Sequence, residues 1–571
     1  MQQPTEQTDL FSQAMERLPL FPLFPLILSI LVMWNLHRPL SVTADGHTYL
    51  QIARNIQMGA GLGWQALWAT PLPPIIIAGV DSVLGIHDLL RTAGLIAPVM
   101  GVLLTASVYF LAEGVLGRRI ALIAALVTAV TPHFLWITFS TEPEIYYTVF
   151  LVTALGLLCR AVVRNSLLYA CGAGCAFCCA YMSRSEGFLI MALTAMALLI
   201  SQGRQAFRTF MPRLVATMIV VFFLAASPYL LFLKHNYGAF VISPKATYVL
   251  IWMKSRIYHD NDKGEQGNDD LWGLTHEGRL KWQVPSGIGD LAAYLLHDPA
   301  KSARVYLHNL AMELPGRIPN NSGALHFPNV FPVYLALLAI FSLFVPWGDA
   351  SAKKKITITS PFLILLILPV FTEGWWKYLV PYAPLLLILA SAGLVFAVDA
   401  ADRKLFRGDR RIGTVVIVLC TLSIMTYYLD RYGNGLLANL IVPKTGITDK
   451  PTEPENSDRN AWLNYAEEAR KSGQWAAAHY GTGKNYMVSW NKMIYYLDGL
   501  WTALPVAAPK EIYAYAIRNR VDLLVFEVTE PEIPDMELIS AVPGFTLDSI
   551  YHSDSSPYRV AFYRPITFLT H

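Results

Sequence analysis

Eleven long apolar runs recur along the chain, and this repetition constrains the possible fold more than any other feature of the sequence. The runs lie at about 20–36, 92–111, 120–138, 145–158, 167–182, 187–201, 214–233, 330–345, 356–371, 378–398 and 412–429. A helix needs roughly 20 mostly apolar residues to cross a bilayer, and flanking residues extend the shorter runs towards that length. A further run at 71–84 is shorter and carries two adjacent prolines, so it predicts a segment at the membrane interface. The pattern predicts a polytopic α-helical membrane protein with about 11 transmembrane helices.

The composition supports this class and excludes others. Of the 571 residues, 54% are hydrophobic and 15% are charged, whereas an ordinary soluble protein has about 25% charged residues. The formal net charge of +3 is too small to indicate a nucleic-acid partner. All six cysteines lie in or at the ends of apolar runs, so none is available to crosslink an exported domain. The group Cys175, Cys178 and Cys179 is predicted to pack within a helix rather than to bind a metal.

The short loops between the runs predict the orientation of the chain. Clusters of lysine and arginine lie at 118–119, 160–164, 204–213, 353–355 and 403–411. With a cytoplasmic N-terminus, all of these clusters fall on the cytoplasmic side, as the positive-inside rule requires. The first run lacks the basic start and the cleavage site of a signal peptide. We therefore expect a multi-pass protein of the inner (plasma) membrane, with the N-terminus cytoplasmic and the C-terminus periplasmic or exterior.

Three stretches are then long enough to fold on the exterior side. Residues 1–429 are predicted to form the transmembrane domain, with exterior loops at 35–91 and 234–329, and residues 430–571 a separate exterior domain. This last stretch combines two kinds of pattern, which together predict an α/β or α+β fold. Helices are expected at 460–473 and 510–519, and strands at 521–526 and 559–563.

Ionisable residues are rare within the apolar runs but gather in four of the loops between them. By the predicted topology all four loops are exterior, and three are very short. An ionisable group at the membrane costs free energy and usually serves a function there, so these residues predict a functional cleft at the exterior surface. They are Asp45 and His47, then His133, Glu142 and Glu144, then Arg184 and Glu186, and finally Glu373 and Lys377.

The acidic residues each have a structural alternative to a functional role. Asp45 could simply cap the helix that follows it, because aspartate is a common capping residue. Glu142 and Glu144 could be solvated loop residues, although a Thr-Glu-Pro-Glu turn between two membrane spans is unusual.

The basic residues also have structural alternatives. Arg184 could pair with Glu186 at the interface and merely end a helix. Lys377 follows two tryptophans and could anchor its helix in an aromatic belt. His47 and the other loop histidine lack a regular metal-ligand spacing, so hydrogen-bonded loop residues are the alternative to ligands.

Taken in order, these loop motifs resemble those of a known family. The motifs are Ala44-Asp45-Gly46-His47-Thr48-Tyr49, Thr70-Pro71-Leu72-Pro73-Pro74, Thr141-Glu142-Pro143-Glu144, Arg184-Ser185-Glu186-Gly187 and Trp376-Lys377-Tyr378-Leu379-Val380-Pro381. Their order over about 1–400 resembles the GT-C superfamily of polytopic glycosyltransferases. The chain is most similar to the branch of protein O-mannosyltransferases and lipid A aminoarabinose transferases. An exterior C-terminal domain is also typical of that branch.

The resemblance implies a role for Asp45, because an acidic residue of the first exterior loop is essential in the family. Many relatives carry a second acidic residue beside it, where this chain has Gly46, so a partner role passes to Glu142 or Glu144. Some relatives have arginine where this chain has Lys377, which keeps the charge but loses the planar fork that binds phosphate through two hydrogen bonds.

The function implied is transfer of a sugar from a polyprenyl-phosphate carrier to an acceptor hydroxyl at the outer face of the membrane, with inversion. The acceptor is a glycan, a lipid or a protein, and no nucleic acid is expected as a partner. The residues indicate no certain cofactor and leave a divalent metal ion open. The expected catalytic residues are Asp45, Glu142 and Glu144, and the expected substrate-binding residues are Arg184, Glu186, Lys377, Tyr378, His47 and Tyr49.

Two other functions are considered beside the transferase. A transporter of lipid-linked glycans or small solutes should carry ionisable residues near the middle of its spans and show internal symmetry, and the sequence shows neither. A non-enzymatic protein of envelope assembly would use the exterior domain as a binding module. Dependence of an activity on the loop carboxylates would distinguish it from an enzyme.

Overall fold

The computed structural model describes most of the chain, and its compact parts fall into two units. It describes residues 23–35, 44–67, 69–138, 140–201, 210–243, 272–281, 288–313, 333–348, 351–367, 376–405, 410–433, 457–488, 492–528, 543–553 and 559–566. Unit 1 comprises Met1–Ser41, Ala93–Pro228 and Leu307–Thr452. Unit 2 comprises Val42–Thr92, Tyr229–Tyr306 and Glu453–His571.

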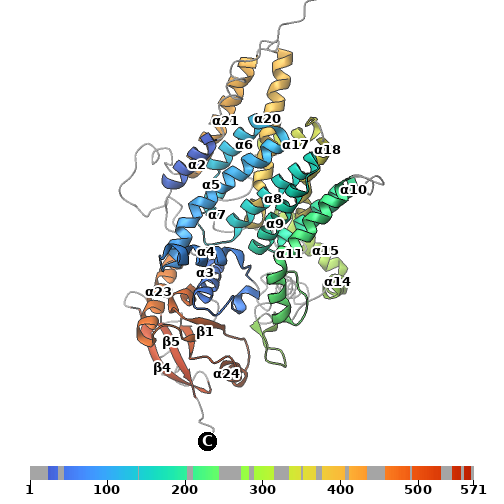
Figure 1. Ribbon diagram of the computed structural model, residues 1–571. Helices are drawn as coiled ribbons and strands as arrows, with labels where there is room; N and C mark the ends of the chain where they lie inside the picture. The colour runs from blue at the N-terminus through green and yellow to red at the C-terminus, as the bar shows by residue number, and fades with distance from the viewer. Residues whose placement is uncertain are drawn as a thin grey trace, which may run out of the picture. The chain divides into compact units, whose positions relative to one another are not determined.

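Unit 1 is built of helices, as its apolar runs predict. Helix α8 packs beside α9, and α17 packs beside α20 (Figure 1). The helices are α2 (Leu23–Asn35), α6 (Arg118–Val130), α7 (Pro132–Thr138), α8 (Glu144–Arg164), α9 (Leu167–Ser183), α10 (Glu186–Ser201), α17 (Val333–Phe344), α18 (Ser351–Thr359), α19 (Trp376–Leu379), α20 (Ala383–Leu405) and α21 (Arg410–Gly433), with the 3-10 turns η4 (Ser360–Leu366) and η6 (Val380–Tyr382). Helices α5 (Leu89–Leu116) and α11 (Met211–Tyr237) belong partly to each unit.

Two glycines allow helices of unit 1 to approach closely. A Cβ at Gly393 of α20 would lie 2.0 Å from the carbonyl oxygen of Leu338 in α17. A Cβ at Gly174 of α9 would lie 2.5 Å from the carbonyl oxygen of Met218 in α11. Neither distance leaves room for a side chain, so these positions require glycine for the observed packing.

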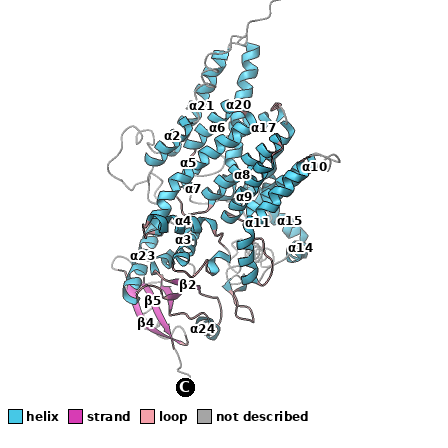
Figure 2. Cartoon of the chain, in the orientation of Figure 1, coloured by secondary structure: helices cyan, strands magenta, loops and turns pink. Residues whose placement is uncertain are grey.

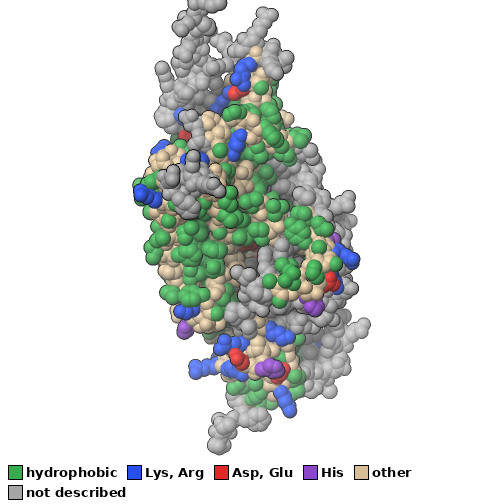
Figure 3. Space-filling model, turned by 90° about the vertical axis from the view of Figure 1, so that its right-hand side faces the viewer, with side chains coloured by type: hydrophobic (Ala, Val, Ile, Leu, Met, Phe, Trp, Pro, Cys, Tyr) green, Lys and Arg blue, Asp and Glu red, His purple; other side chains and the backbone are tan. Residues whose placement is uncertain are grey.

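Many helices of the structure have the composition of membrane spans. Among the described residues, four helices are both long and apolar enough to cross a bilayer, namely Leu89–Leu116, Glu144–Arg164, Met211–Tyr237 and Val380–Arg403. Shorter apolar helices occur at several of the other predicted runs. Hydrophobic side chains cover much of the visible helical surface in Figure 3, and some are almost fully exposed, such as Phe344 at 82%. The mostly helical membrane fold is thus confirmed, while the number of 11 spans stays a prediction.

Unit 2 contains a mixed five-stranded sheet, drawn as arrows in Figure 2, whose strands follow the order β2-β1-β3-β5-β4. Strand β1 runs parallel to β2 and β3, whereas β5 runs antiparallel to β3 and β4. The strands are β1 (Asn485–Val488), β2 (Leu500–Ala503), β3 (Leu523–Val528), β4 (Phe545–His552) and β5 (Arg559–Pro565).

The sheet alternates its side chains between two cores, because neighbouring residues of a strand point to opposite faces. Tyr486 and Val488 pack in one core with Ala469 of α23 (Ser457–Tyr480). Met487 packs in the other core with Tyr515 of α24 (Pro509–Arg518). A helix therefore contributes to each core of the sheet.

The sequence predicted part of this domain correctly. The helices expected at 460–473 and 510–519 are α23 and α24, and the strands expected at 521–526 and 559–563 correspond to β3 and β5. The sequence analysis did not predict β1, β2 or β4, which are short or more polar. A sheet domain of mixed α and β elements at the C-terminal end is confirmed.

The remaining elements of unit 2 come from the predicted exterior loops. They are α3 (Ala44–Gln57), η1 (Trp64–Leu67), α4 (Leu72–Leu84), α14 (Ile288–His297), α15 (Pro299–Glu313), which ends in unit 1, and η7 (Lys492–Leu497) from the C-terminal stretch. The run at 71–84 is thus the helix α4, with Pro73 and Pro74 in its first turn, where proline is tolerated. Its place at the membrane interface stays a prediction, as does the division into a transmembrane domain at 1–429 and an exterior domain at 430–571.

Candidate functional site

Three helix ends of unit 1 bring Arg184 between two acidic residues. Helix α8 begins at Glu144, α9 ends immediately before Arg184, and α10 begins at Glu186. The connection between α9 and α10 is so short that Arg184 and Glu186 must lie close together. Packing of α8 against α9 adds Glu144 to the pair.

Arg184 forms two ion pairs inside the protein. Its Nη1 donates a short hydrogen bond to Oε1 of Glu144, and its Nη2 donates one of 2.8 Å to Oε1 of Glu186. The side chains of Arg184 and Glu144 are only 8% and 3% exposed. The guanidinium carbon lies 4.7 Å from the ring centroid of Tyr378, so an aromatic face covers the cation.

Among the described residues of this cluster, one guanidinium faces two carboxylates. Burial alone lowers the pKa of the Arg184 guanidinium, but the carboxylates of Glu186 and Glu144 outweigh burial and hold that pKa above its ordinary value. Arg184 therefore stays cationic. The second oxygen of Glu144, Oε2, is buried and has no hydrogen-bond partner within the described part of the chain. A buried carboxylate oxygen in this state is a ready acceptor for a substrate hydroxyl.

Glu142 and Glu144 are both buried, at 6% and 2% exposure. The alternative that they are solvated loop residues is therefore wrong. Arg184 and Glu186 do form an ion pair, as that alternative for Arg184 expected, but Arg184 is buried and also pairs with Glu144.

Two tyrosines next to the cluster were missed in the sequence analysis. Tyr147 follows Glu144 by about one helical turn of α8, and its hydroxyl lies 3.3 Å from that of Tyr382 in η6. Both side chains are buried. The one available signal was the spacing of Glu144 and Tyr147, which puts them on one helix face.

The first loop that is predicted to be exterior contains helix α3, which carries Asp45, His47 and Tyr49. Asp45 is half-buried and lies in the first turn. The helix begins at Ala44, one residue before Asp45, and the alternative that Asp45 caps this helix stays a prediction. Its negative charge is favourable there, because the amide groups of a helix start are partly positive.

His47 and Tyr49 are buried, each at 3% exposure. The ring of His47 meets those of Tyr495 and Tyr496 edge-on, at centroid distances of 6.4 and 6.1 Å. Both tyrosines belong to η7 of the C-terminal domain. His47 thus packs against that domain, and its role in substrate binding stays a prediction.

Several polar contacts hold α3 and the turn after it against the C-terminal domain. Nε2 of Gln51 donates a 2.7 Å hydrogen bond to the carbonyl oxygen of Gly499. Arg54 pairs with Asp498 at 3.3 Å. Nε1 of Trp64 donates a 2.6 Å hydrogen bond to the carbonyl oxygen of Trp501. No local pattern marks these contacts, since they join residues more than 430 positions apart.

The structure places the other predicted residues less completely. Lys377 and Tyr378 lie on the short helix α19, and the side chain of Lys377 is outside the described residues, as is Glu373. In the described part of the chain, no three His, Cys, Asp or Glu side chains gather as a metal site would require. The use of a divalent metal ion therefore stays a prediction.

Comparison with known proteins gives one partial family match and extensive structural matches. Residues 69–231 match the family model of dolichyl-phosphate-mannose-protein mannosyltransferases. No curated protein matches the chain in sequence. ArnT from Cupriavidus metallidurans, solved with bound undecaprenyl phosphate, is 14% identical, with 96% of this chain and 98% of that chain covered and a TM-score of 0.54.

An archaeal protein shows a similar likeness. Oligosaccharyltransferase AglB from Archaeoglobus fulgidus, solved with an inhibitory peptide and a dolichol-phosphate, is 14% identical, with a TM-score of 0.54. The match covers 88% of this chain and 69% of that chain. Structural likeness at such identities establishes the fold. The shared fold and the match of residues 69–231 agree with the resemblance that the loop motifs carry.

Proposed function

We propose that the protein transfers a sugar from a polyprenyl-phosphate carrier to an acceptor hydroxyl, with inversion, at the outer face of the inner (plasma) membrane. The observation that carries this proposal is the carboxylate of Glu144, which Arg184 holds in a buried position while its Oε2 has no hydrogen-bond partner among the described residues. Such a group can orient a sugar or acceptor hydroxyl without competition from water. The lipid-phosphate ligands of ArnT and AglB support the class of carrier.

The reaction needs a base, and we assign this role to Asp45. The acceptor hydroxyl must lose its proton as its oxygen attacks the anomeric carbon. Asp45 is half-buried in the first turn of α3, where a negative charge is favoured. Direct attack with a single base and departure of the lipid phosphate inverts the configuration at the anomeric carbon.

The leaving phosphate gains negative charge as the bond to the sugar breaks, so a cation must stabilise it. Arg184 and Lys377 are our candidates for this role. The two ion pairs of Arg184 also give it a positioning role, because they fix Glu144 and Glu186. Tyr378, His47 and Tyr49 are proposed to complete the binding of donor and acceptor.

Glu142 and Glu144 would hold a divalent cation if the reaction uses one, because hard divalent ions prefer carboxylate oxygens. The cation would then neutralise the phosphate. Purified protein should lose activity in chelator and regain it with added metal, and Glu142→Gln should weaken this dependence. Full activity in chelator would leave the two residues only the role of positioning the acceptor.

The proposal is tested with the full-length protein in lipid nanodiscs. Undecaprenyl-phosphate-linked sugars serve as donors, and mass spectrometry of envelope glycans from cells with and without the protein identifies the acceptor. Wild type should transfer sugar, and Glu144→Gln should be strongly impaired. Asp399→Asn is the matched control in unit 1, because Asp399 is 45% exposed and pairs with Arg119 at the surface. No difference in glycans, or transfer without loss in the Glu144 variant, would contradict the proposal.

A further inference from the structure

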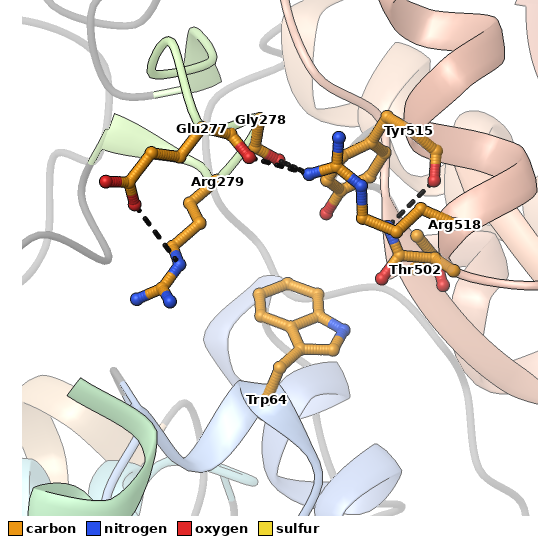
Figure 4. A pocket seen from close by; sticks show the side chains of 8 residues that line it. Trp64, Glu277, Gly278, Arg279, Thr502, Tyr515 and Arg518 are labelled. Atoms are coloured by element: carbon orange, nitrogen blue, oxygen red, sulfur yellow. Dashed lines mark hydrogen bonds and ion pairs between the residues drawn. The ribbon is translucent and has the colours of Figure 1, made fainter. Parts of the chain in front are cut away.

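Unit 2 contains a cavity of about 410 Å³ that the transfer reaction does not account for. Its walls come from three parts of the chain, namely η1, the segment 272–281 and the C-terminal sheet domain, as Figure 4 shows. The size is within the range of small-molecule sites. The side chains that matter for its chemistry are Trp64, Glu277, Arg279, Thr502, Arg518 and Asn519.

One wall is a tight hairpin within 272–281 that is joined to the C-terminal domain. The amide of Thr275 donates to the carbonyl of Arg279 at 2.7 Å, which closes the hairpin. The amide of Val506 donates to the carbonyl of Trp272 at 2.9 Å, which joins the hairpin to the chain after β2. Backbone hydrogen bonds thus hold the wall in place.

The opposite wall is the indole of Trp64. Its Nε1 is engaged with the carbonyl of Trp501, and the two indole rings pack at a centroid distance of 4.6 Å. Both contacts fix the orientation of the ring, and Figure 4 shows it directed towards the space between Arg279 and Thr502. A fixed aromatic face next to hydroxyl and amide groups suits a sugar ring, which has apolar C–H faces and a polar edge.

The charge of the lining favours an acidic ligand. Arg518 donates through Nη1 to the carbonyl oxygens of Glu277 and Gly278, at 2.7 and 3.2 Å, and these carbonyls carry no formal charge. Arg279 pairs only loosely with the carboxylate of Glu277, at 3.8 Å. Two guanidinium groups therefore face one carboxylate among the described lining residues, and guanidinium forks suit carboxylate and phosphate.

Gly278 of the hairpin lies directly against the guanidinium of Arg518. The backbone at Gly278 has φ of +72°, which favours glycine, and a Cβ there would lie 2.4 Å from Nη1 of Arg518. Any larger residue would displace the guanidinium from the hairpin.

The geometry points to a saccharide-binding site for an acidic sugar of the acceptor, with Trp64 as the stacking surface and Arg279 and Arg518 as partners of the acidic group. The inference rests on the proposed function, since it names the chemistry of the acceptor. Binding of a free saccharide requires no donor and no transfer, so its measurement can succeed or fail independently of the proposed reaction.

The experiment measures binding of trigalacturonic acid to the full-length protein in nanodiscs by titration calorimetry and saturation-transfer NMR. The fully methyl-esterified trisaccharide is the matched probe, because it keeps the three sugar rings and replaces each carboxylate by an uncharged ester. The acid should bind about tenfold more tightly than the ester, and this preference should shrink at high salt. Arg279→Gln should remove most of the preference, and Trp64→Leu should weaken both probes.

Arg520→Gln is the control variant, since Arg520 is exposed near the same helix end but does not line the cavity. It should bind both probes as wild type does. Thermal unfolding of each variant separates lost binding from lost folding, and Arg279→Gln leaves the backbone bonds of the hairpin in place. Absence of binding to wild type, equal binding of acid and ester, or unchanged binding in Arg279→Gln and Trp64→Leu would overturn the inference.

Discussion

Arg184 donates a hydrogen bond to the buried carboxylate of Glu144, although the two residues are 40 positions apart and lie at the ends of different helices. The pair is enclosed in the protein and shares the guanidinium with Glu186. A buried charge is stable only when it is paired and hydrogen-bonded. The contact therefore makes the position of Glu144 depend on Arg184, and each can be tested through the other.

Replacement of Arg184 by Gln should destabilise the protein severely. The buried carboxylate of Glu144 and the half-buried carboxylate of Glu186 would lose this cation, and loss of one partner of a buried ion pair costs about 3–5 kcal/mol. Glu144→Gln keeps the pair of Arg184 with Glu186 and should preserve folding while it reduces turnover. Thermal unfolding in nanodiscs measures the first effect and sugar transfer the second. The double variant Arg184→Gln, Glu144→Gln should lose less unfolding free energy than the two single variants lose together. A loss equal to the sum of the two single losses would argue against the coupling.

Replacement of Asp45 by Asn should lower turnover by roughly 100-fold or more, the usual scale of a general base. Asparagine keeps the shape and the hydrogen bonds to a helix start but cannot take a proton. Asp88→Asn is the control, because Asp88 accepts a hydrogen bond from the amide of Arg91 at the start of α5. Membrane levels of both variants should equal those of wild type. Normal turnover of Asp45→Asn would remove Asp45 from the chemistry.

Gln51→Leu should destabilise unit 2 by about 1–3 kcal/mol. Leucine has a similar volume but leaves the carbonyl oxygen of Gly499 without its donor, and an unsatisfied buried group carries that cost. Gly499→Ala should be worse, because a Cβ there would lie 2.2 Å from the carbonyl oxygen of Lys484. Hydrogen exchange of α3 is the measurement. Amide exchange in Gln51→Leu as slow as in wild type would show that the hydrogen bond of Gln51 to Gly499 does not stabilise unit 2.

Asp81 should make the protein sensitive to acid. Burial raises the pKa of its carboxyl, but hydrogen bonds from Thr92 and Gln57 outweigh burial and hold the pKa below the ordinary value of 3.8. A lowered pKa of Asp81 stabilises the folded protein at every pH above the ordinary pKa. This stabilisation is lost as the pH falls through the lowered pKa. Unfolding from pH 7 to pH 3 should show Asp81→Asn less stable than wild type, with a difference that shrinks below about pH 4. A constant difference would contradict this.

Reporter fusions test the orientation. A fusion after Arg411 should be cytoplasmic, since the lysine and arginine clusters of the loops are expected there. A fusion near Gly473 should be exterior, because α23 belongs to the C-terminal domain. Alkaline phosphatase and fluorescent-protein fusions report opposite sides of the membrane, so each checks the other. A cytoplasmic signal near Gly473 would reverse the topology and place the loop carboxylates on the wrong side for the proposed reaction.

The sequence was sufficient for the helical membrane class, because long apolar runs have few other stable solutions in a bilayer. It also predicted Glu144, Arg184 and Glu186 as candidate site residues, since a charged residue at the membrane costs free energy and usually serves a function there. The order of the loop motifs was specific enough to indicate the GT-C superfamily. Strands β3 and β5 were predictable for a similar reason, because they are rich in the apolar and aromatic residues typical of strands.

Only the tertiary structure decided which of these residues meet. Burial of Glu142 and Glu144 depends on helices that surround them, and no local pattern distinguishes a buried turn from a solvated one. Contacts such as that of Gln51 with Gly499 join distant parts of the chain, as do the three walls of the cavity around Trp64. Sequence periodicity reports the local conformation and the buried face of one element. The element that covers that face is selected by packing and hydrogen bonding over the whole chain. These contacts join residues that are distant in sequence, so they exist only in the folded protein.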